Sequence, residues 1–310
     1  MHTERIQSIP PMSRVSRLTS PICLLCLGLL LFACRTEPVP VQLSAPPVRL
    51  VVASQFVPDR GLVVFLTRTF SPLEEAPERE RDTLTDAFVE KILVKDAVVT
   101  LTAGGRTDTL RMLSPGVYGG LTVLQSPYTR YELYAHDPLT GETATAAAEM
   151  LPPVTFERVE PAIVYPDGQD AYVEVRYAFR DDPAVQNWYL VNYYRKVTLD
   201  LNVLTPNTFT DGASNRSLAF DLISDEKLDG TLFSRDRRLA EISVTDTIGV
   251  SVANISRGYY EFLALYGRSG NLLTQITGEP IDYPTNVTNG YGYFTTHIPD
   301  LRVFDLNQYQ

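Results

Sequence analysis

Cysteine is scarce in this chain of 310 residues, and its three copies all lie near the N-terminus. Cys23 and Cys26 lie inside an apolar run, and Cys34 ends that run. If residues 1–33 are removed as a leader, Cys34 is the one cysteine of the mature chain. The folded part then has no disulfide, no thiolate zinc site and no thiol nucleophile.

Histidine is also rare, and beyond the leader only His136 and His297 remain, far apart in sequence. We therefore expect no metal site and no cofactor. The chain lacks a nucleophile elbow, a zinc-protease motif, a phosphate loop and a dinucleotide fingerprint. No catalytic residue is predicted. A glycoside hydrolase remains the enzymatic alternative, because that reaction needs only two suitably spaced carboxylates.

Basic residues are outnumbered. The chain has 27 basic and 37 acidic residues, of which residues 1–33 hold three and one, so the mature chain has a net charge near −12. Such a surface repels phosphate backbones. Nucleic acid is therefore excluded as an expected partner.

A long apolar run is missing as well. Residues 22–33 are apolar but too few to span a bilayer, which needs roughly 20 residues. Arg14 and Arg17 precede the run, as in a secretory signal peptide. Leu31 and the following Phe-Ala-Cys resemble a lipobox, the bacterial signal for acylation of the cysteine and cleavage before it. An uncleaved anchor and a conventional cleavage nearby are the alternatives.

The segments around this signal refine the prediction. Met12 is the preferred initiator, with Met1 as the alternative, because residues 1–11 hold Glu4 and two prolines. Arg35, rather than aspartate, follows the cysteine, which favours the outer membrane and leaves its face undecided. Residues 34–47 form the lipidated cysteine and a proline-rich tether, or else a first edge strand.

The rest of the chain predicts a mainly β fold: two β-sandwich domains of immunoglobulin or transthyretin type with one or two short helices. The first domain is placed at 48–153, with hairpins turning at Pro58–Gly61 and at Gly104–Gly105 and a short helix within 83–92. The second is placed at 154–310, where Ser256 caps a helix near 256–266.

Aromatic residues are frequent in this second domain. Exposed aromatic rings can stack on a sugar or anchor a protein contact, and core packing is the alternative. Gly290 and Gly292 permit the positive φ of a tight turn that presents nearby rings. The candidate binding residues are Trp188, Tyr291, Tyr293 and Phe294.

Several short motifs together resemble the family called domain of unknown function 4249. They are Leu50–Val52, Lys95–Leu101, Gly116–Tyr118, Pro152–Pro153, Tyr259–Leu263, Pro284, Asn286, Asn289 and Gly290–Phe294. The resemblance implies an outer-membrane lipoprotein of Bacteroidota, often encoded beside a TonB-dependent transporter, with no established catalytic residues. We expect a noncatalytic accessory or binding lipoprotein, attached to the membrane by its N-terminal lipid. A structural or adhesive envelope module is the alternative.

Overall fold

The computed structural model describes most of the chain beyond residue 46. The described segments are 47–57, 61–70, 79–80, 83–84, 86–120, 126–168, 170–195, 217–226, 228, 230–240, 242–269 and 283–309. Most of these residues lie in β-strands, and two helices, α2 (Asp86–Ile92) and α3 (Arg257–Ser269), accompany them. The predicted mainly β fold with short helices is confirmed. Within these segments, no helix has the length and apolar character needed to cross a membrane.

The largest sheet, named the N-terminal sheet, has nine strands in the order β16-β9-β8-β5-β6-β7-β2-β1-β17. Their bounds are β1 (Leu50–Val57), β2 (Gly61–Arg68), β5 (Val98–Ala103), β6 (Arg106–Ser114), β7 (Val117–Gly119), β8 (Arg130–His136), β9 (Thr143–Glu149), β16 (Val287–Thr288) and β17 (Gly290–Tyr293). A separate two-residue pair joins β3 (Arg79–Glu80) to β4 (Thr83–Leu84).

Both predicted hairpins are present in this sheet. β1 pairs antiparallel with β2 along its whole length. β5 pairs with β6 up to Ala103 and Arg106, and the two glycines between them have φ values of 57° and 78°. Only glycine adopts such values without steric cost, so Gly104 and Gly105 set the register of the hairpin.

The last two strands of the N-terminal sheet come from the C-terminal part of the chain. β16 pairs antiparallel with β9, β17 pairs parallel with β1, and only Asn289 separates the two. The Ser54 hydroxyl donates to the Thr295 carbonyl (2.9 Å) and accepts from the Thr295 amide (2.7 Å). The two edge strands of the sheet, β16 and β17, are consecutive in sequence. The sheet must therefore curl so that its two edges lie close together.

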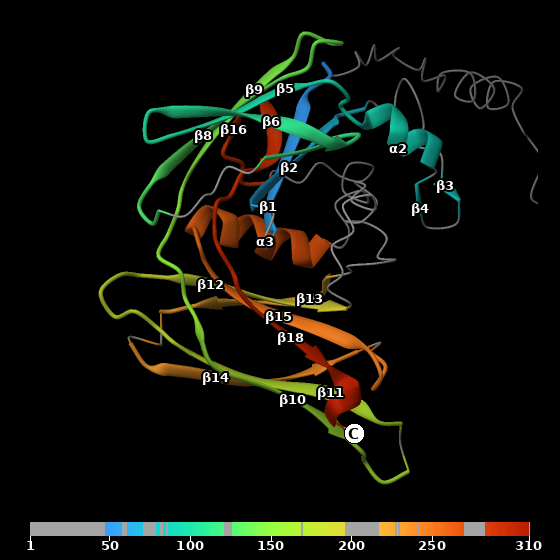
Figure 1. Ribbon diagram of the computed structural model, residues 1–310, viewed down its shortest axis with the longest axis vertical. Coiled ribbons are helices and arrows are strands. Elements are labelled where there is room, and N and C mark those ends of the chain that lie inside the picture. The colour runs from blue at the N-terminus through green and yellow to red at the C-terminus, as the bar shows by residue number, and fades with distance from the viewer. Residues whose placement is uncertain are drawn as a thin grey trace, which may run out of the picture. The chain divides into compact units, whose positions relative to one another are not determined.

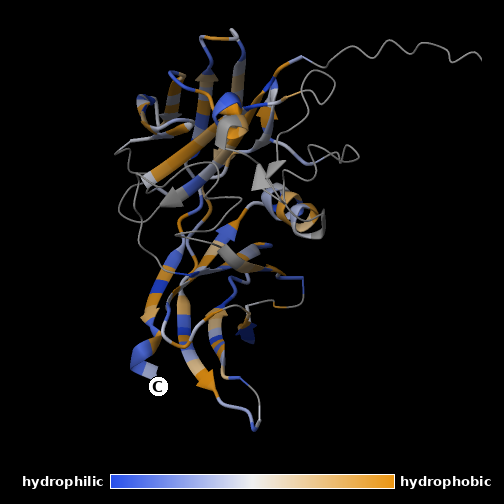
Figure 2. Ribbon diagram, turned by 90° about the vertical axis from the view of Figure 1, so that its right-hand side faces the viewer, coloured by the Kyte–Doolittle hydropathy of each residue, from blue (hydrophilic) through white to orange (hydrophobic). Residues whose placement is uncertain are grey.

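One apolar cluster fills the inside of this curled sheet. Strands from both ends contribute to it, including Leu50 of β1, Leu133 of β8 and Val287 of β16, and Phe294 lies fully buried just after β17. Alternate residues along each strand point to this cluster, as β8 shows by its alternation of exposed and buried positions. Figure 2 shows the matching alternation of apolar and polar colour along the strands.

The remaining strands form two smaller sheets. The β11 sheet has the order β10-β11-β14, and the β12 sheet has the order β13-β12-β15-β18. Their bounds are β10 (Phe156–Val164), β11 (Tyr172–Arg180), β12 (Trp188–Arg195), β13 (Ser217–Ser224), β14 (Leu232–Leu239), β15 (Thr247–Ile255) and β18 (Asp300–Asp305), and a 3-10 turn, η3 (Leu306–Tyr309), follows.

The β11 and β12 sheets pack face to face through aromatic rings (Figure 1). Phe179 of β11 meets Tyr189 of β12 with ring centroids 4.7 Å apart. Tyr177 meets Tyr193 across the same interface at 6.3 Å. Large aromatic side chains bury much area, so these rings contribute strongly to the packing of the two sheets, together with valine, isoleucine and leucine side chains of the same cluster.

Helix α3 covers the other face of the β12 sheet. Leu263 packs against Leu190 of β12 and Ile255 of β15. On another side of the helix, the Tyr259 and Phe262 rings lie 5.2 Å and 5.6 Å from the ring of Tyr293. The helix therefore lies between the β12 sheet and the N-terminal sheet (Figure 1).

The strand pairing crosses the predicted domain division. Residues 45–310 form one compact unit, and β16 and β17, assigned by sequence to the domain 154–310, pair with strands of the segment 48–153. The glycines on either side of Tyr291 permit this pairing, because a Cβ atom at either position would overlap a backbone carbonyl oxygen of β1. The boundary near Pro153 and the count of two sandwiches stay predictions.

Candidate functional site

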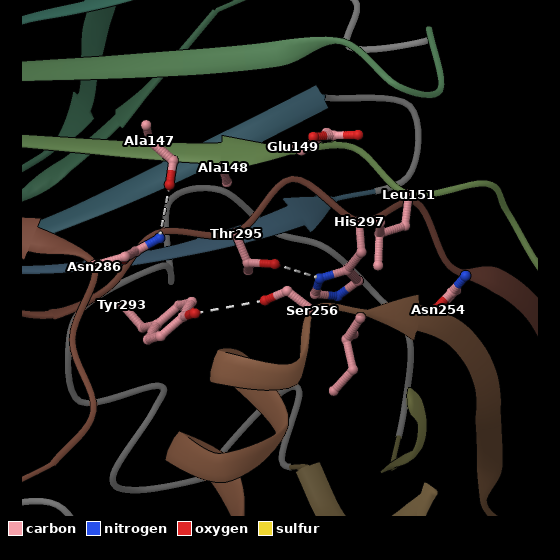
Figure 3. A pocket seen from close by; sticks show the side chains of 11 residues that line it. Ala147, Ala148, Glu149, Leu151, Asn254, Ser256, Asn286, Tyr293, Thr295 and His297 are labelled. Carbon is pink, nitrogen blue, oxygen red and sulfur yellow. Dashed lines mark hydrogen bonds between the residues drawn. The ribbon is translucent and has the colours of Figure 1, made fainter. Parts of the chain in front are cut away.

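A cavity of about 170 Å³ lies where three distant segments meet. They are the end of β9, the end of β15 with the start of α3, and the chain around and beyond β17. Figure 3 shows the side chains that converge on it. The lining residues are Ala147, Ala148, Glu149, Leu151, Asn254, Ile255, Ser256, Asn286, Tyr293, Thr295 and His297.

Asn254, near the end of β15, is a buried polar residue of this cavity. It is 7% exposed, and its Nδ2 donates to the Pro152 carbonyl (3.3 Å) and to Asn187 Oδ1 (3.0 Å). Both bonds fix the orientation of the amide. Its Oδ1 is buried and has no hydrogen-bond partner. An unsatisfied buried acceptor typically costs about 1–3 kcal/mol, so this atom favours a donor from a bound molecule or water.

His297 forms a second polar part of the wall. Its Nδ1 lies 2.9 Å from Thr295 Oγ1, and its ring stacks at 5.7 Å from that of Tyr259. Burial lowers the pKa of His297 to about 4. The imidazole is therefore neutral at neutral pH, with one nitrogen that donates and one that accepts a hydrogen bond.

Ser256 and Tyr293 complete the polar lining at the start of α3. The Ser256 hydroxyl accepts from the Tyr259 amide at 3.3 Å, which makes Ser256 the predicted N-cap of the helix. The hydroxyls of Ser256 and Tyr293 lie 3.5 Å apart. Burial raises the pKa of Tyr293, so its hydroxyl stays protonated and available as a donor.

Asn286 holds the wall in place from the side of β16. Its Nδ2 donates to the Ala147 carbonyl (3.0 Å) and the Phe294 carbonyl (2.7 Å), and its Oδ1 accepts from the Phe294 amide (2.9 Å). Both hydrogen atoms of the Asn286 amide group and its oxygen are therefore engaged with the backbone. Asn286 therefore positions the cavity and leaves recognition to Asn254, His297 and Ser256.

The chemistry of this lining suits hydrogen bonding to a neutral molecule. Among the described residues, no lysine or arginine lines the cavity, and Glu149 is the single carboxylate of its wall. The polar groups come with small or aliphatic neighbours such as Ala148, Leu151 and Ile255. Binding sites for small molecules commonly combine a mostly apolar wall with a few placed polar groups.

The four predicted binding residues have different environments. Tyr291 is 56% exposed on β17, whereas Phe294 is fully buried in the core of the N-terminal sheet. Tyr293 is half-buried between the cavity and α3, and Trp188 is half-buried against the cluster under α3. Strand alternation explains the difference between Tyr291 and Phe294, and only Tyr291 presents a largely free ring. Cys34 lies outside the described residues.

Sequence reasoning did not single out Asn254, Thr295 or His297 as a group. Asn254 lies within β15, a strand of mostly buried residues, and Thr295 and His297 follow β17. No motif joins these positions, because the curling of the sheet brings them together. Among the described residues, no group of three or more acidic, histidine or cysteine residues could hold a metal ion.

Acid should destabilise the protein through His297. Its pKa is about 4 in the folded protein against 6.5 for the free side chain, so the unfolded state binds more protons between these values. Above pH 6.5, His297 is neutral in both states and does not lower the free energy of unfolding. As the pH drops toward 4, this free energy falls by up to about 1.4 kcal/mol per pH unit.

Urea denaturation of the wild type and His297→Gln at a series of pH values measures this effect. The variant should lose less stability than the wild type over that interval, since the carboxylates contribute equally to both proteins. Parallel losses in the two proteins would show that the folded ring is protonated as readily as a free one.

Comparison with known families identifies the family of this chain. Residues 36–298 match the family model described as a domain of unknown function, DUF4249. The match covers most of the chain, so the chain belongs to this family, and the resemblance in the motifs is confirmed. No curated protein matches it.

Proposed function

We propose that this member of the DUF4249 family is a noncatalytic binding or accessory protein of the cell envelope. A lipid on Cys34 holds it to the outer membrane, and it acts beside a TonB-dependent transporter. The run Leu31-Phe32-Ala33-Cys34 carries the proposal, since it combines a lipobox-like sequence with a following proline-rich segment. Several acyl chains on one cysteine give nearly permanent attachment, because each buried methylene contributes about 0.8 kcal/mol.

The folded unit supplies two features that a binding protein needs. One is the small cavity at Asn254 and His297. The other is the ring of Tyr291, which is 56% exposed on a strand fixed between β1 and α3. Rigidly held aromatic side chains are frequent anchors of protein interfaces. Tyr291 is therefore the residue assigned to the transporter contact.

Affinity purification from detergent-solubilised membranes tests the proposal. Wild-type protein should be recovered from the membrane fraction together with a TonB-dependent transporter, and its mass should correspond to a lipidated chain starting at Cys34. Cys34→Ser should block processing and remove the protein from the outer-membrane fraction. Tyr291→Ala should keep the anchor but reduce the recovered transporter at least about tenfold.

Two matched substitutions serve as controls. Cys26→Ser removes a cysteine of the same apolar run and should leave anchoring unchanged. Tyr165→Ala removes a tyrosine that is 65% exposed elsewhere and should leave transporter recovery unchanged. Recovery of Cys34→Ser in the outer-membrane fraction would contradict the anchor. Equal transporter recovery from wild type and Tyr291→Ala would contradict the contact.

A further inference from the structure

The cavity beside Asn254 has the size of a single six-membered ring. Its volume is about 170 Å³. An engineered apolar cavity of about 150 Å³ in another protein holds benzene. A saturated six-membered ring with hydroxyl substituents is larger, so its ring can enter while the remaining substituents extend past the exposed Glu149 toward solvent. The cavity at Asn254 differs because its wall carries amide, hydroxyl and imidazole groups. A ring that fits here must therefore bear polar substituents.

The hydrogen-bonding groups specify which substituents. Asn254 Oδ1 has no partner and accepts, so the ring must bring a donor to it. The Asn254 amide cannot turn over to donate instead, because its Nδ2 already donates to Pro152 and Asn187. Ser256 and His297 each both donate and accept. Groups that do both, such as hydroxyls, match this mixture.

The charge of the wall argues against an ionic ligand. In the part of the chain that the structure describes, no cationic side chain lines the cavity, and Glu149 would repel an anion. Glu149 is exposed, so its charge is screened by solvent and gives only weak attraction for a cation. The ring of Tyr293 adds a flat apolar surface, which suits the C–H face of a saturated ring.

We propose that this cavity binds one residue of a neutral pyranose sugar, with a ring hydroxyl donating to Asn254 Oδ1 and others bonding to His297 and Ser256. The inference deepens the binding role proposed above and rests on it for its biological setting. The geometry of the cavity itself belongs to the folded unit and does not depend on the membrane anchor.

Saturation-transfer difference NMR on the detergent-solubilised full-length protein tests this inference. The probes are glucose, galactose, mannose and N-acetylglucosamine, each at millimolar concentration, with methylammonium and acetate as charged probes. At least one sugar should show saturation transfer, and the charged probes should show none. Asn254→Leu should weaken the sugar affinity about tenfold, the loss expected for one hydrogen bond.

A second pair of variants covers the case in which Asn254→Leu unfolds. Leu151→Trp fills the cavity from its partly exposed wall and should abolish the sugar signal. Leu139→Trp makes the same change at a residue that is 78% exposed in another turn and should preserve the signal. Thermal melts of all variants confirm that folded proteins are compared.

Three outcomes would overturn the inference. One is saturation transfer from no sugar, which would leave ordered water as the sole occupant of the cavity. Another is transfer from methylammonium alone, which would assign the site to Glu149. The third is an equal sugar signal from wild type and Leu151→Trp. Recovery of the transporter by wild type in these cases would leave the proposed function standing, so the two failures are distinguishable.

Discussion

Replacing Gly292 with alanine should lower the free energy of unfolding by about 4 kcal/mol or more, among the largest effects of any single substitution. Gly292 has φ of 92°, and a Cβ atom there would overlap the carbonyl oxygen of Val52 on β1. The oxygen belongs to the backbone and cannot move aside without breaking the β1–β17 pairing. Urea denaturation monitored by circular dichroism gives the measurement.

Gly104→Ala is the matched control for this substitution. Gly104 also has positive φ, 57°, but nothing lies within 4 Å of a Cβ at that position. It should therefore cost only the backbone strain, about 1–2 kcal/mol. Equal losses at the two glycines would mean that strain alone is measured and that the close approach of β17 to β1 contributes nothing to stability.

Arg68→Ala should destabilise the protein by about 3–5 kcal/mol, the range for breaking a buried ion pair. Arg68 Nε and Nη2 donate to Asp137 at 2.6 Å and 2.9 Å, and Asp137 is 0% exposed. Burial by itself would raise the pKa of Asp137, but hydrogen bonds from Arg68, Thr140 and the Leu139 amide outweigh it and lower the pKa. Without Arg68, a buried carboxylate loses its counter-charge.

The exposed pair Arg176–Asp236 supplies the control. It has similar geometry, with Nε and Nη2 donating at 2.8 Å and 3.3 Å, but both side chains are about half exposed. Arg176→Ala should change the denaturation midpoint much less than Arg68→Ala, since solvent replaces the lost bonds. Similar shifts would show that burial of Asp137 adds nothing.

Local patterns predicted the local structure well. The hairpins at β1–β2 and β5–β6, the helix α2 and the Ser256-capped helix α3 all follow from residue spacing and turn chemistry within short windows. Each of these features depends on neighbours in sequence, such as Gly104 with Gly105. A single sequence contains that information directly.

The long-range features could not be read in the same way. Pairing of β16 with β9 and of β17 with β1 depends on which strand edges remain free after the rest of the sheet forms. The buried Asp221, which accepts from the hydroxyls of Tyr177 (3.1 Å) and Tyr193 (2.9 Å), looks in sequence like a surface residue of β13. The cavity has the same origin, since Asn254 and His297 meet only after the sheet curls.

Among the described strands, the free edge of β1 is paired only by β17, which comes near the end of the chain. This order also determines when pairing of that edge can occur during folding. The bonded pair Ser54 and Thr295 is separated by 241 positions. Contacts over such separations form late, because the entropy of loop closure must be lost before they add stability. While the chain emerges from its N-terminus onward, β1 and β9 have open edges, which invite pairing with other chains. Completion of the N-terminal sheet therefore waits for nearly the last residues of the chain, and until β16 and β17 arrive the edges of β1 and β9 are open to pairing with another chain.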